Sequence, residues 1–452
     1  MNANTLKLTE GRIGGSLIRF AIPFLLSGLF QVLYGTVDVW FIGHYATGNS
    51  IAGVSSAAQA MGLVTNMFMG LTMGGTVLIG QYMGAQRYDD CGRVTGNLVL
   101  LFAGIAAAMT VIMVLLGSTI NGWMQVPPDA VSEADNYIRV CGIGSVFIIG
   151  YNVVSAILRG LGNSKAPLYF VAIASLTNIV LDYVFVALFR WNAFGAALAT
   201  IISQGVSLIV GIIYIKKTGL PYKFGRAHLK TDKATMGRIL KIGIPAASRQ
   251  TLVGFSFTFI TTITNGLGVA AAAGAGVVNR AIDVCMIIPG SMNGALTSFT
   301  AQNVGAGKPE RARKGLYICI GLCLCISIPY TLIANISPET VVGILSDEPE
   351  VIREGAQYLI PFSWDCVLVS FVFCLNGFFT GLGKTTFVLI HDTCTTFLIR
   401  VPIVYFVSTI PGRTMFQMGL GTPAATIVSL LLCLIYLKWK CNKKALAEMT
   451  VV

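Results

Sequence analysis

The chain has 452 residues, of which 55% are hydrophobic and only 11% are charged, and its mean hydropathy is +0.75. A typical soluble domain carries about 25% charged residues, so this sequence lacks the polar residues needed to cover a water-exposed surface of its size. Composition therefore excludes a soluble enzyme, a nucleic-acid-binding protein and a secreted module. It predicts a chain that lies mostly in a bilayer as helices, which satisfy their own backbone hydrogen bonds.

Twelve apolar stretches follow one another along the chain, each near the roughly 20 residues that a bilayer core requires. The second and eighth are long and rich in Gly, so each is interpreted as one tilted or kinked helix. The count is twelve, with eleven or thirteen as alternatives. The predicted spans are 17–42, 51–82, 94–117, 135–157, 167–190, 194–215, 239–264, 270–303, 315–335, 356–380, 386–409 and 418–438.

The distribution of Lys and Arg predicts the orientation of these spans. With the N-terminus inside, 24 of the 31 basic residues fall in inside segments. Cytoplasmic loops are enriched in Lys and Arg, so we expect both termini in the cytoplasm. The net charge of +12 is then a topology signal and indicates no nucleic-acid partner. The first apolar run is longer than that of a cleaved signal peptide, and we expect it to remain as a span.

Short segments between the spans recur at a constant offset. Residues 81–93 align with 302–314 at a shift of 221, Gly-Leu-Gly at 160–162 aligns with 381–383 at the same shift, and Ile-Pro at 22–23 aligns with 244–245 at 222. A repeat of six spans gives two parallel halves, the arrangement of transporters that rock two lobes about a central site.

The predicted fold is therefore an all-α integral membrane protein with twelve transmembrane helices. They form two six-helix lobes related by a pseudo-two-fold axis along the membrane normal. We place the N-lobe at 1–215, a solvated cytoplasmic linker at 216–237, and the C-lobe with a short cytoplasmic tail at 238–452.

Apart from Asp135 at the outer end of the fourth span, five acidic residues lie within predicted spans, where an uncompensated charge costs about 3 kcal/mol at the bilayer centre. Each needs a partner, a proton or a water-filled cavity, so these five are the candidates for a mechanism. They are Asp38, Asp182, Asp283, Asp365 and Asp392.

Three spans of the first half carry polar oxygens at a similar depth. Asp38 is in the first, Asp182 lies one turn from Asn178 in the fifth, and Thr200 is in the sixth. Such oxygens suit a desolvated Na⁺. They equally suit a proton shared by two carboxylates, because like charges in one site are costly to keep ionised together. We predict a coupling site for H⁺ or Na⁺ here, with no other cofactor.

The alternative is that each Asp only hydrogen-bonds its neighbours to fix helix packing. Shifted by 221, the two positions fall on Phe259 and Ile403, so the second half lacks both acids. A purely architectural requirement would be expected in both halves, which favours a role in the mechanism.

Further polar residues surround this set. Helical spacing places Gln31 and Tyr34 on the face of Asp38. Ser203 and Gln204 follow Thr200 on the same side of the sixth span. We predict that these four residues line the substrate cavity.

Charges in the second half are interpreted differently. Arg280 and Asp283 have i, i+3 spacing and are expected to form a structural ion pair, and Asp392 and Arg400 share a helix face eight residues apart. Asp365 and Asp392 are alternative contributors to a cation pathway.

Pro23 lies near the inner end of the first span and removes a helix hydrogen bond. It predicts a hinge that couples protonation of Asp38 to the shape of the cavity, with a static kink as the alternative.

Six motifs, in this order and spacing, carry a resemblance over nearly the full length. They are YGTVD at 34–38, GQYMGA at 80–85, LRGLGNSK at 158–165, NIVLD at 178–182, GAALAT at 195–200 and GLGKT at 381–385. With them the chain resembles the multidrug and toxic compound extrusion (MATE) family, and within it the DinF-like bacterial branch.

The resemblance implies a two-lobe antiporter that exports amphipathic organic cations in exchange for H⁺ or Na⁺ by alternating access. It also implies that Asp38, Asn178, Asp182 and Thr200 form the ion site. We expect no enzyme activity and a multi-pass monomer in the bacterial inner (cytoplasmic) membrane. Its expected partners are small cationic substrates and membrane lipid.

The chain departs from the family pattern in its seventh span, since residues 239–265 contain no acid where other branches carry an essential one. Asp365 falls near an acid used in the tenth span of the NorM-like branch, so a role for the second lobe stays open.

The sequence is less consistent with three other functions. A lipid or lipid-linked-oligosaccharide flippase of the same superfamily needs a cationic cavity, whereas only Arg249, Arg280 and Arg400 lie in spans away from the span ends. A membrane-embedded enzyme needs a catalytic cluster, and no HExxH, DxD or nucleophile–base motif stands out. A passive channel is disfavoured by the two-lobe repeat.

Overall fold

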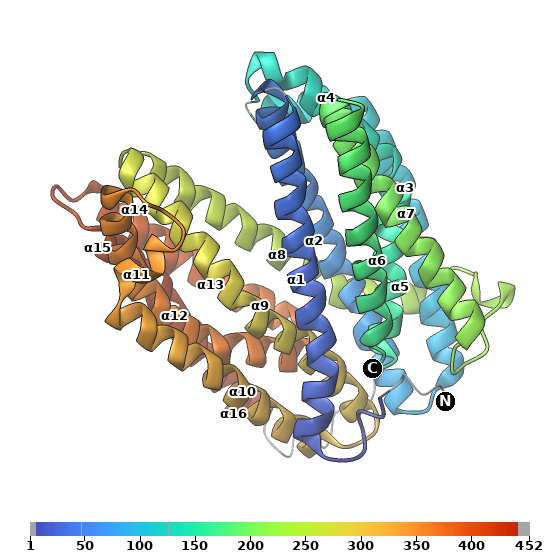
Figure 1. The fold of residues 1–452 in the computed structure, drawn as a ribbon. Coiled ribbons are helices and arrows are strands. Elements are labelled where there is room, and N and C mark those ends of the chain that lie inside the picture. Colours follow the sequence, from blue (N-terminus) through green and yellow to red (C-terminus); the bar gives the residue numbers. More distant parts are fainter. Residues whose placement is uncertain (1–5, 47, 125, 442–452) are drawn as a thin grey trace. The chain divides into compact units, whose positions relative to one another are not determined.

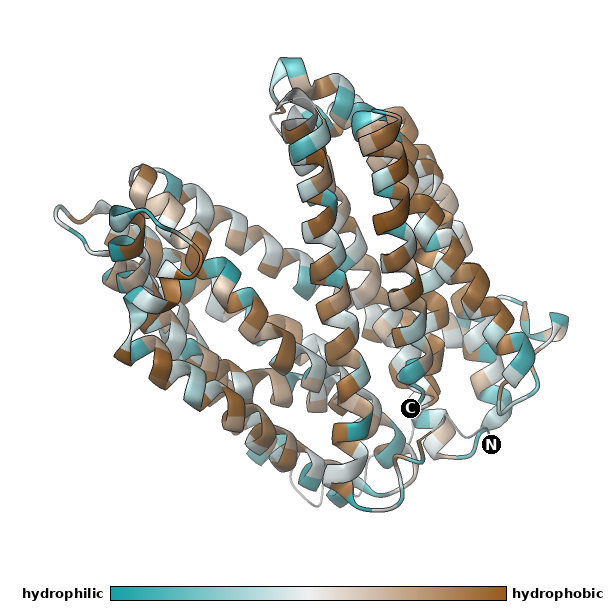
Figure 2. Cartoon of the chain, in the orientation of Figure 1, coloured by the Kyte–Doolittle hydropathy of each residue, from teal (hydrophilic) through white to brown (hydrophobic). Residues whose placement is uncertain are grey.

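The computed structural model describes residues 6–46, 48–124 and 126–441, and most of that chain is helical (Figure 1). Residues 1–5 and 442–452, which the sequence places at the cytoplasmic termini, lie outside the described part. Figure 2 shows apolar residues along the helices, with hydrophilic residues gathered at helix ends and in the connections.

The helices of the first half cover the first six predicted spans. They are α1 (Ile13–Tyr45), α2 (Gly48–Gly84), α3 (Tyr88–Trp123), the 3-10 turn η1 (Pro128–Ala130), α4 (Val131–Ile143), α5 (Ser145–Gly160), α6 (Lys165–Asp182), the π-helical turn η2 (Tyr183–Leu188) and α7 (Asn192–Thr218).

The helices of the second half cover the other six. After the 3-10 turn η3 (Arg226–His228) come α8 (Lys233–Asn265), α9 (Val269–Gly305), α10 (Pro309–Ile336), α11 (Pro338–Gly343), α12 (Pro349–Gly381), α13 (Thr385–Thr395), the π-helical turn η4 (Thr396–Arg400), α14 (Val401–Thr409), α15 (Met415–Gly419) and α16 (Gly421–Lys440).

Within the described residues, ten helices are long and apolar enough to cross a bilayer, and one bent pair makes an eleventh. The second and eighth spans are each one helix of 37 residues, as predicted. The helix of the predicted seventh span, α8, is not among the ten. It has 33 residues and carries Arg238, Lys241 and Arg249.

The bent pair is the predicted fourth span, which was expected to be continuous over 135–157. It breaks between α4 and α5 at Gly144, with an angle of 51°. Ile201 of α7 packs so closely against Gly144 that a Cβ atom there would overlap its side chain. A glycine at the break therefore lets α7 approach the backbone of the bent span.

The chain divides into two compact units, and two helices contribute to both. Unit 1 comprises Met1–Lys7 and Ile22–Ala247, and unit 2 comprises Leu8–Ala21 and Ser248–Val452. The start of α1 thus belongs to unit 2 and its remainder to unit 1, whereas α8 begins in unit 1 and ends in unit 2. These boundaries differ from the sequence-based division, and they lie close to Pro23 in α1 and Pro245 in α8.

The internal repeat is visible in matching contacts within each unit. In unit 1, the Thr76 hydroxyl of α2 donates to the Ala156 carbonyl of α5 over 3.1 Å. In unit 2, Thr297 of α9 donates to the Gly377 carbonyl of α12 over 3.2 Å. Both residues of the second bond lie 221 positions after those of the first, which is the shift found in the sequence.

Residues of the repeated segments 81–93 and 302–314 also form hydrogen bonds to the first turns of α8 and to the residues just before α1, the two helices that the units share. In unit 1, Arg238 of α8 donates to the Tyr82 hydroxyl over 2.8 Å. In unit 2, Asn303 donates to the carbonyl of Leu8, and Arg311 donates to the Gly11 carbonyl. Tyr82 and Asn303 are again 221 residues apart, so the repeat has the same packing role in both units.

The predicted linker is partly docked rather than simply solvated. Tyr222 is buried and hydrogen-bonds Thr95 of α3, and this burial raises the pKa of its phenol. Asn97 accepts from the Asp232 amide over 2.9 Å. A bond from the Thr235 hydroxyl holds the pKa of Asp232 below its usual range, at the start of α8.

Candidate functional site

Two of the five span acids lie together in unit 1. Asp38 is 9% exposed in α1, and Asp182, the last residue of α6, is fully buried. Their carboxylates are close enough to interact electrostatically. The apolar cluster in the same part of the unit includes Phe41, Ile138 and Val186. Two acids therefore share a poorly hydrated region of one lobe.

The position of Asp182 follows from a local irregularity in the fifth span. The α-helical hydrogen bonding of α6 ends at Asp182 and gives way to the π-helical turn η2, which continues to Leu188. Single π-helical turns inside α-helices are rare and are frequent at functional sites. Asp182 therefore lies where the hydrogen bonding of the helix changes from α-helical to π-helical.

The polar atoms of this region are left without hydrogen-bond partners among the described residues. These atoms are Oδ1 of Asp38, both carboxylate oxygens of Asp182, and both side-chain polar atoms of Asn178. An unsatisfied buried polar group costs about 1–3 kcal/mol, and more when it is charged. Such oxygens therefore favour a proton, a cation or water as their partner.

Thr200 lies near this set through a residue that the sequence analysis missed. The phenol of Tyr137, from α4, hydrogen-bonds Thr200 and is close enough to Asp38 for an electrostatic interaction. Tyr34 of α1 is a second phenol beside Asp38. The available signal for Tyr137 was a Tyr inside a predicted span, because a buried Tyr hydroxyl usually requires a partner.

A small cavity adjoins the buried polar groups. It has a volume of about 30 Å³, which is room for about two water molecules. Organic ligands occupy cavities of about 300–1,000 Å³, so this one is of the size of water or a small ion. The four residues predicted to line a substrate cavity line this one, with five others from α5 and α6: Gln31, Tyr34, Tyr151, Val171, Ala174, Ser175, Asn178, Ser203 and Gln204.

The donor set fits a monovalent cation. Carboxylate, amide and hydroxyl oxygens are the ligands of hard cations, and they come here from Asp38, Asp182, Asn178 and Thr200. Within the described residues no group of three or more His, Cys, Asp or Glu is placed to hold a metal ion. Two carboxylates without further acids suit H⁺ or Na⁺ better than a divalent metal.

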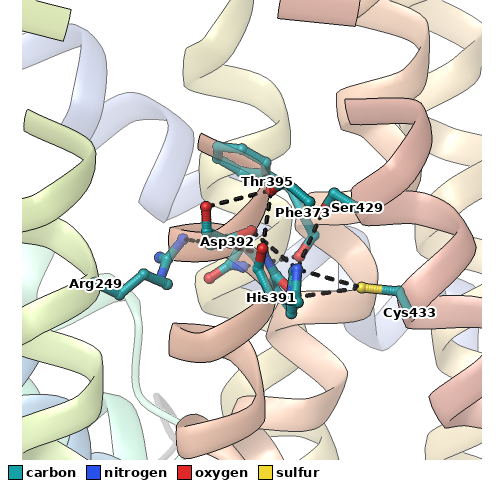
Figure 3. Close-up of polar contacts among 9 residues, drawn as sticks. Arg249, Phe373, His391, Asp392, Thr395, Ser429 and Cys433 are labelled. Atoms are coloured by element: carbon teal, nitrogen blue, oxygen red, sulfur yellow. Dashed lines mark hydrogen bonds and ion pairs between the residues drawn. The ribbon is translucent and has the colours of Figure 1, made fainter. Parts of the chain in front are cut away.

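Unit 2 contains a polar cluster of a different kind (Figure 3). Arg249 of α8 forms an ion pair with Asp392 of α13, with Nη1 and Oδ2 2.9 Å apart. Asn376 of α12 donates to the same oxygen over 3.2 Å. His391 hydrogen-bonds Asn376 and Ser429 through its two ring nitrogens. This carboxylate has partners, unlike those of unit 1.

Asp392 pairs with Arg249 rather than with Arg400, although both Asp392 and Arg400 meet α8. The π-helical turn η4, which ends at Arg400, lies between the two residues and shifts the register of the helix. Arg400 instead lies over the Phe257 ring, 4.3 Å from its centroid, and donates to Thr422. It also interacts electrostatically with Asp365, which is buried in α12.

Two other expectations concerned the Arg280–Asp283 pair and the hinge at Pro23. Arg280 interacts electrostatically with Asp283, but in the part of the chain that the structure describes the two form no ion pair. Pro23 lies within the continuous helix α1, where its carbonyl accepts from the Ser27 hydroxyl over 2.7 Å.

Comparison with known proteins gives consistent matches over most of the chain. The family model described as MatE matches residues 23–184 and again residues 245–406. The probable multidrug resistance protein YpnP of Bacillus subtilis is 27% identical, over 91% of this chain and 92% of YpnP. The probable multidrug resistance protein YoeA of the same organism is 25% identical, over 98% of each chain.

The fold is also found among solved structures. The chain is similar to the outward-facing conformation of a multidrug resistance MATE family transporter of the MOP superfamily. The TM-score is 0.90 and the identity 21%, with 99% of this chain and 100% of the other covered. This likeness shows an all-helical fold of twelve transmembrane helices in two lobes.

Proposed function

Since the chain belongs to the MATE family, we propose that it is a secondary active efflux antiporter, which exports amphipathic organic cations in exchange for H⁺ or Na⁺. The observation that carries this proposal is the pair of buried carboxylates in unit 1, three of whose four oxygens lack hydrogen-bond partners among the described residues. The names of YpnP and YoeA, both probable multidrug resistance proteins, support the substrate class.

In this mechanism the coupling ion is a substrate that enters from outside the cell. It reaches Asp38 and Asp182 through the cavity lined by Tyr34 and Asn178. Binding of one H⁺ or Na⁺ lowers the negative charge of the pair by one, which weakens its attraction for an organic cation. Release of the ion on the cytoplasmic side restores the charge. Alternating access to the two sides of the membrane then makes the two fluxes opposite.

The size of the cavity adds a requirement to this cycle. At about 30 Å³ it accepts an ion or water but excludes an organic cation. The region around Gln31 and Gln204 therefore has to widen when the drug binds. We propose that ion occupancy and cavity volume change together, so that an ion and a drug are not held at the same time.

The test is efflux from proteoliposomes loaded with ethidium, under separately imposed pH and Na⁺ gradients. Asp38→Asn and Asp182→Asn should each reduce gradient-driven efflux by about tenfold or more, because each removes a charge that binds the coupling ion, and a polar contact with a charged group contributes about 1.5–3 kcal/mol. The gradient that drives the wild-type protein identifies the coupling ion. Asp283→Asn, a span acid outside the site, should retain efflux. Unchanged efflux in both site variants would contradict the assignment of Asp38 and Asp182 to the coupling site.

A flippase for phosphate-bearing lipids is less well supported. It needs cations in the spans that are available to bind phosphate. Arg249 is instead paired with Asp392, and Arg400 lies beside Asp365. Enzyme activity is not expected either, and absence of turnover together with ligand-dependent transport is the predicted result. We expect the protein to work as a monomer in the bacterial cytoplasmic membrane.

A further inference from the structure

A second, apolar depression lies in unit 1 between α3, α5 and α7. It has a volume of about 410 Å³, within the range of organic ligand sites. Its floor is buried, with Phe102, Ile149 and Ile157 each no more than 3% exposed. Its rim is exposed and apolar, and includes Val99 and Val146. A groove of this kind accepts a flexible hydrocarbon chain from the side of the membrane.

The polar lining of the groove is restricted to one end. Only Thr95 and Lys216 among its lining residues have polar side chains, and Thr95 is already hydrogen-bonded to Tyr222. Lys216 is exposed in the last turn of α7 and, among the described residues, forms no ion pair. The groove therefore has a cationic end and an apolar remainder.

The length of the groove matches one leaflet. Its lining runs from Thr95 to Ala106 on α3 and from Ile157 to Val146 on α5, a rise of about 16 Å on each helix. The hydrocarbon core of a bilayer is about 30 Å thick, so each leaflet contributes about half of that. The start of α3 and the ends of α5 and α7 lie at the end of the groove that carries Lys216, which the Lys and Arg distribution places in the cytoplasm.

From this juxtaposition we propose that the groove is a binding site for one phospholipid of the inner leaflet with an anionic headgroup. One acyl chain lies along α3, α5 and α7, and the phosphate contacts the Lys216 ammonium. The occupant is an anionic lipid rather than an organic cation, because the single charge at the groove is positive. Residues of the ion site do not line the groove, so this proposal stands apart from the proposed transport function.

The experiment is native mass spectrometry of the full-length protein in detergent. Phosphatidylglycerol or phosphatidylcholine with identical palmitoyl and oleoyl chains is added at equal concentration. The wild-type protein should retain one phosphatidylglycerol with about fivefold preference, the order expected for one Lys at an anionic headgroup. Lys216→Gln should abolish the preference, whereas Lys217→Gln, its exposed neighbour outside the groove, should keep it.

The apolar part is tested by filling it. Ala103 lines the groove and is exposed, so Ala103→Trp should reduce retention of both lipids at least fivefold, whereas Ala107→Trp on the same helix should not. A measurement without substitution guards against misfolding: phosphatidylglycerol with eight-carbon chains should be retained at least fivefold less, because each buried methylene stabilises binding.

Three results would overturn the proposal. The first is equal retention of the two headgroups by the wild-type protein, and the second is retention that does not depend on chain length. The third is displacement of the lipid by ethidium or by a second copy of the chain, seen as a drug adduct or a dimer mass, which would assign the groove to that occupant.

Discussion

The carboxylate of Asp392 has its charge compensated on several sides. The Arg249 guanidinium lies 2.9 Å away, and Asn376 donates to the same oxygen. Asp38 and Asp182 are buried to a similar or greater extent but have oxygens without such bonds among the described residues. At the scale of single residues, these contacts favour a structural role for Asp392, and they are the basis of the proposed role of Asp38 and Asp182 in binding an exchangeable ion.

A structural role for Asp392 predicts a loss of stability. In Asp392→Asn the Arg249 charge stays largely buried without its counter-charge, and breaking a buried pair costs about 3 kcal/mol. The midpoint of thermal unfolding in detergent should fall, and the double variant Arg249→Gln/Asp392→Asn should recover part of the loss. Asp347→Asn, an exposed loop acid, should stay within about 0.5 kcal/mol. An unchanged midpoint in Asp392→Asn contradicts the role.

At the scale of elements, the connection between α7 and α8 packs on the start of α3. Gly96 of α3 meets the backbone of His228 so closely that a Cβ atom would overlap the carbonyl oxygen of that residue. Gly96→Ala should therefore lift the segment from α3 and free the backbone around Lys223 and Arg226, whose side chains are already exposed, for a protease. Faster limited proteolysis by trypsin is expected, by about tenfold. Gly104→Ala, where a Cβ meets open space, is the control. Equal cleavage of both variants argues against docking.

The helices were predictable from the sequence, whereas local changes within them were not. Hydropathy predicted the helices, and Asp38 and Asp182, which the structure brings together, were selected from their place in those helices. A hydropathy profile does not detect a local change in helical winding. The break at Gly144 and the π-helical turn that ends at Arg400 were therefore not predicted. Tyr137 was missed because its partner, Thr200, is distant in sequence. The DinF-like branch stays a prediction.

At the scale of the whole molecule, unit 1 is completed by residues beyond the first six spans. The start of α8 packs on α2, where Ala247 meets Gly70 and the Ile239 carbonyl meets Gly74. A fragment of residues 1–247 should therefore resist trypsin better than one of residues 1–225, by about tenfold in cleavage rate. Both fragments contain the same six spans. Equal resistance would show that the start of α8 adds nothing to this unit.

The sharing of α1 and α8 between the units has a consequence for biosynthesis. When the ribosome has finished α7, unit 1 still lacks the start of α8, and the segment Leu8–Ala21 still lacks Asn303 and Arg311, the residues that bind its first part. Neither unit can finish folding while only the first half has been translated. The early helices therefore have to leave the membrane insertion machinery before either unit is complete. Folding ends only when segments synthesised at different times, such as Leu8–Ala21 and the helices that carry Asn303 and Arg311, come together.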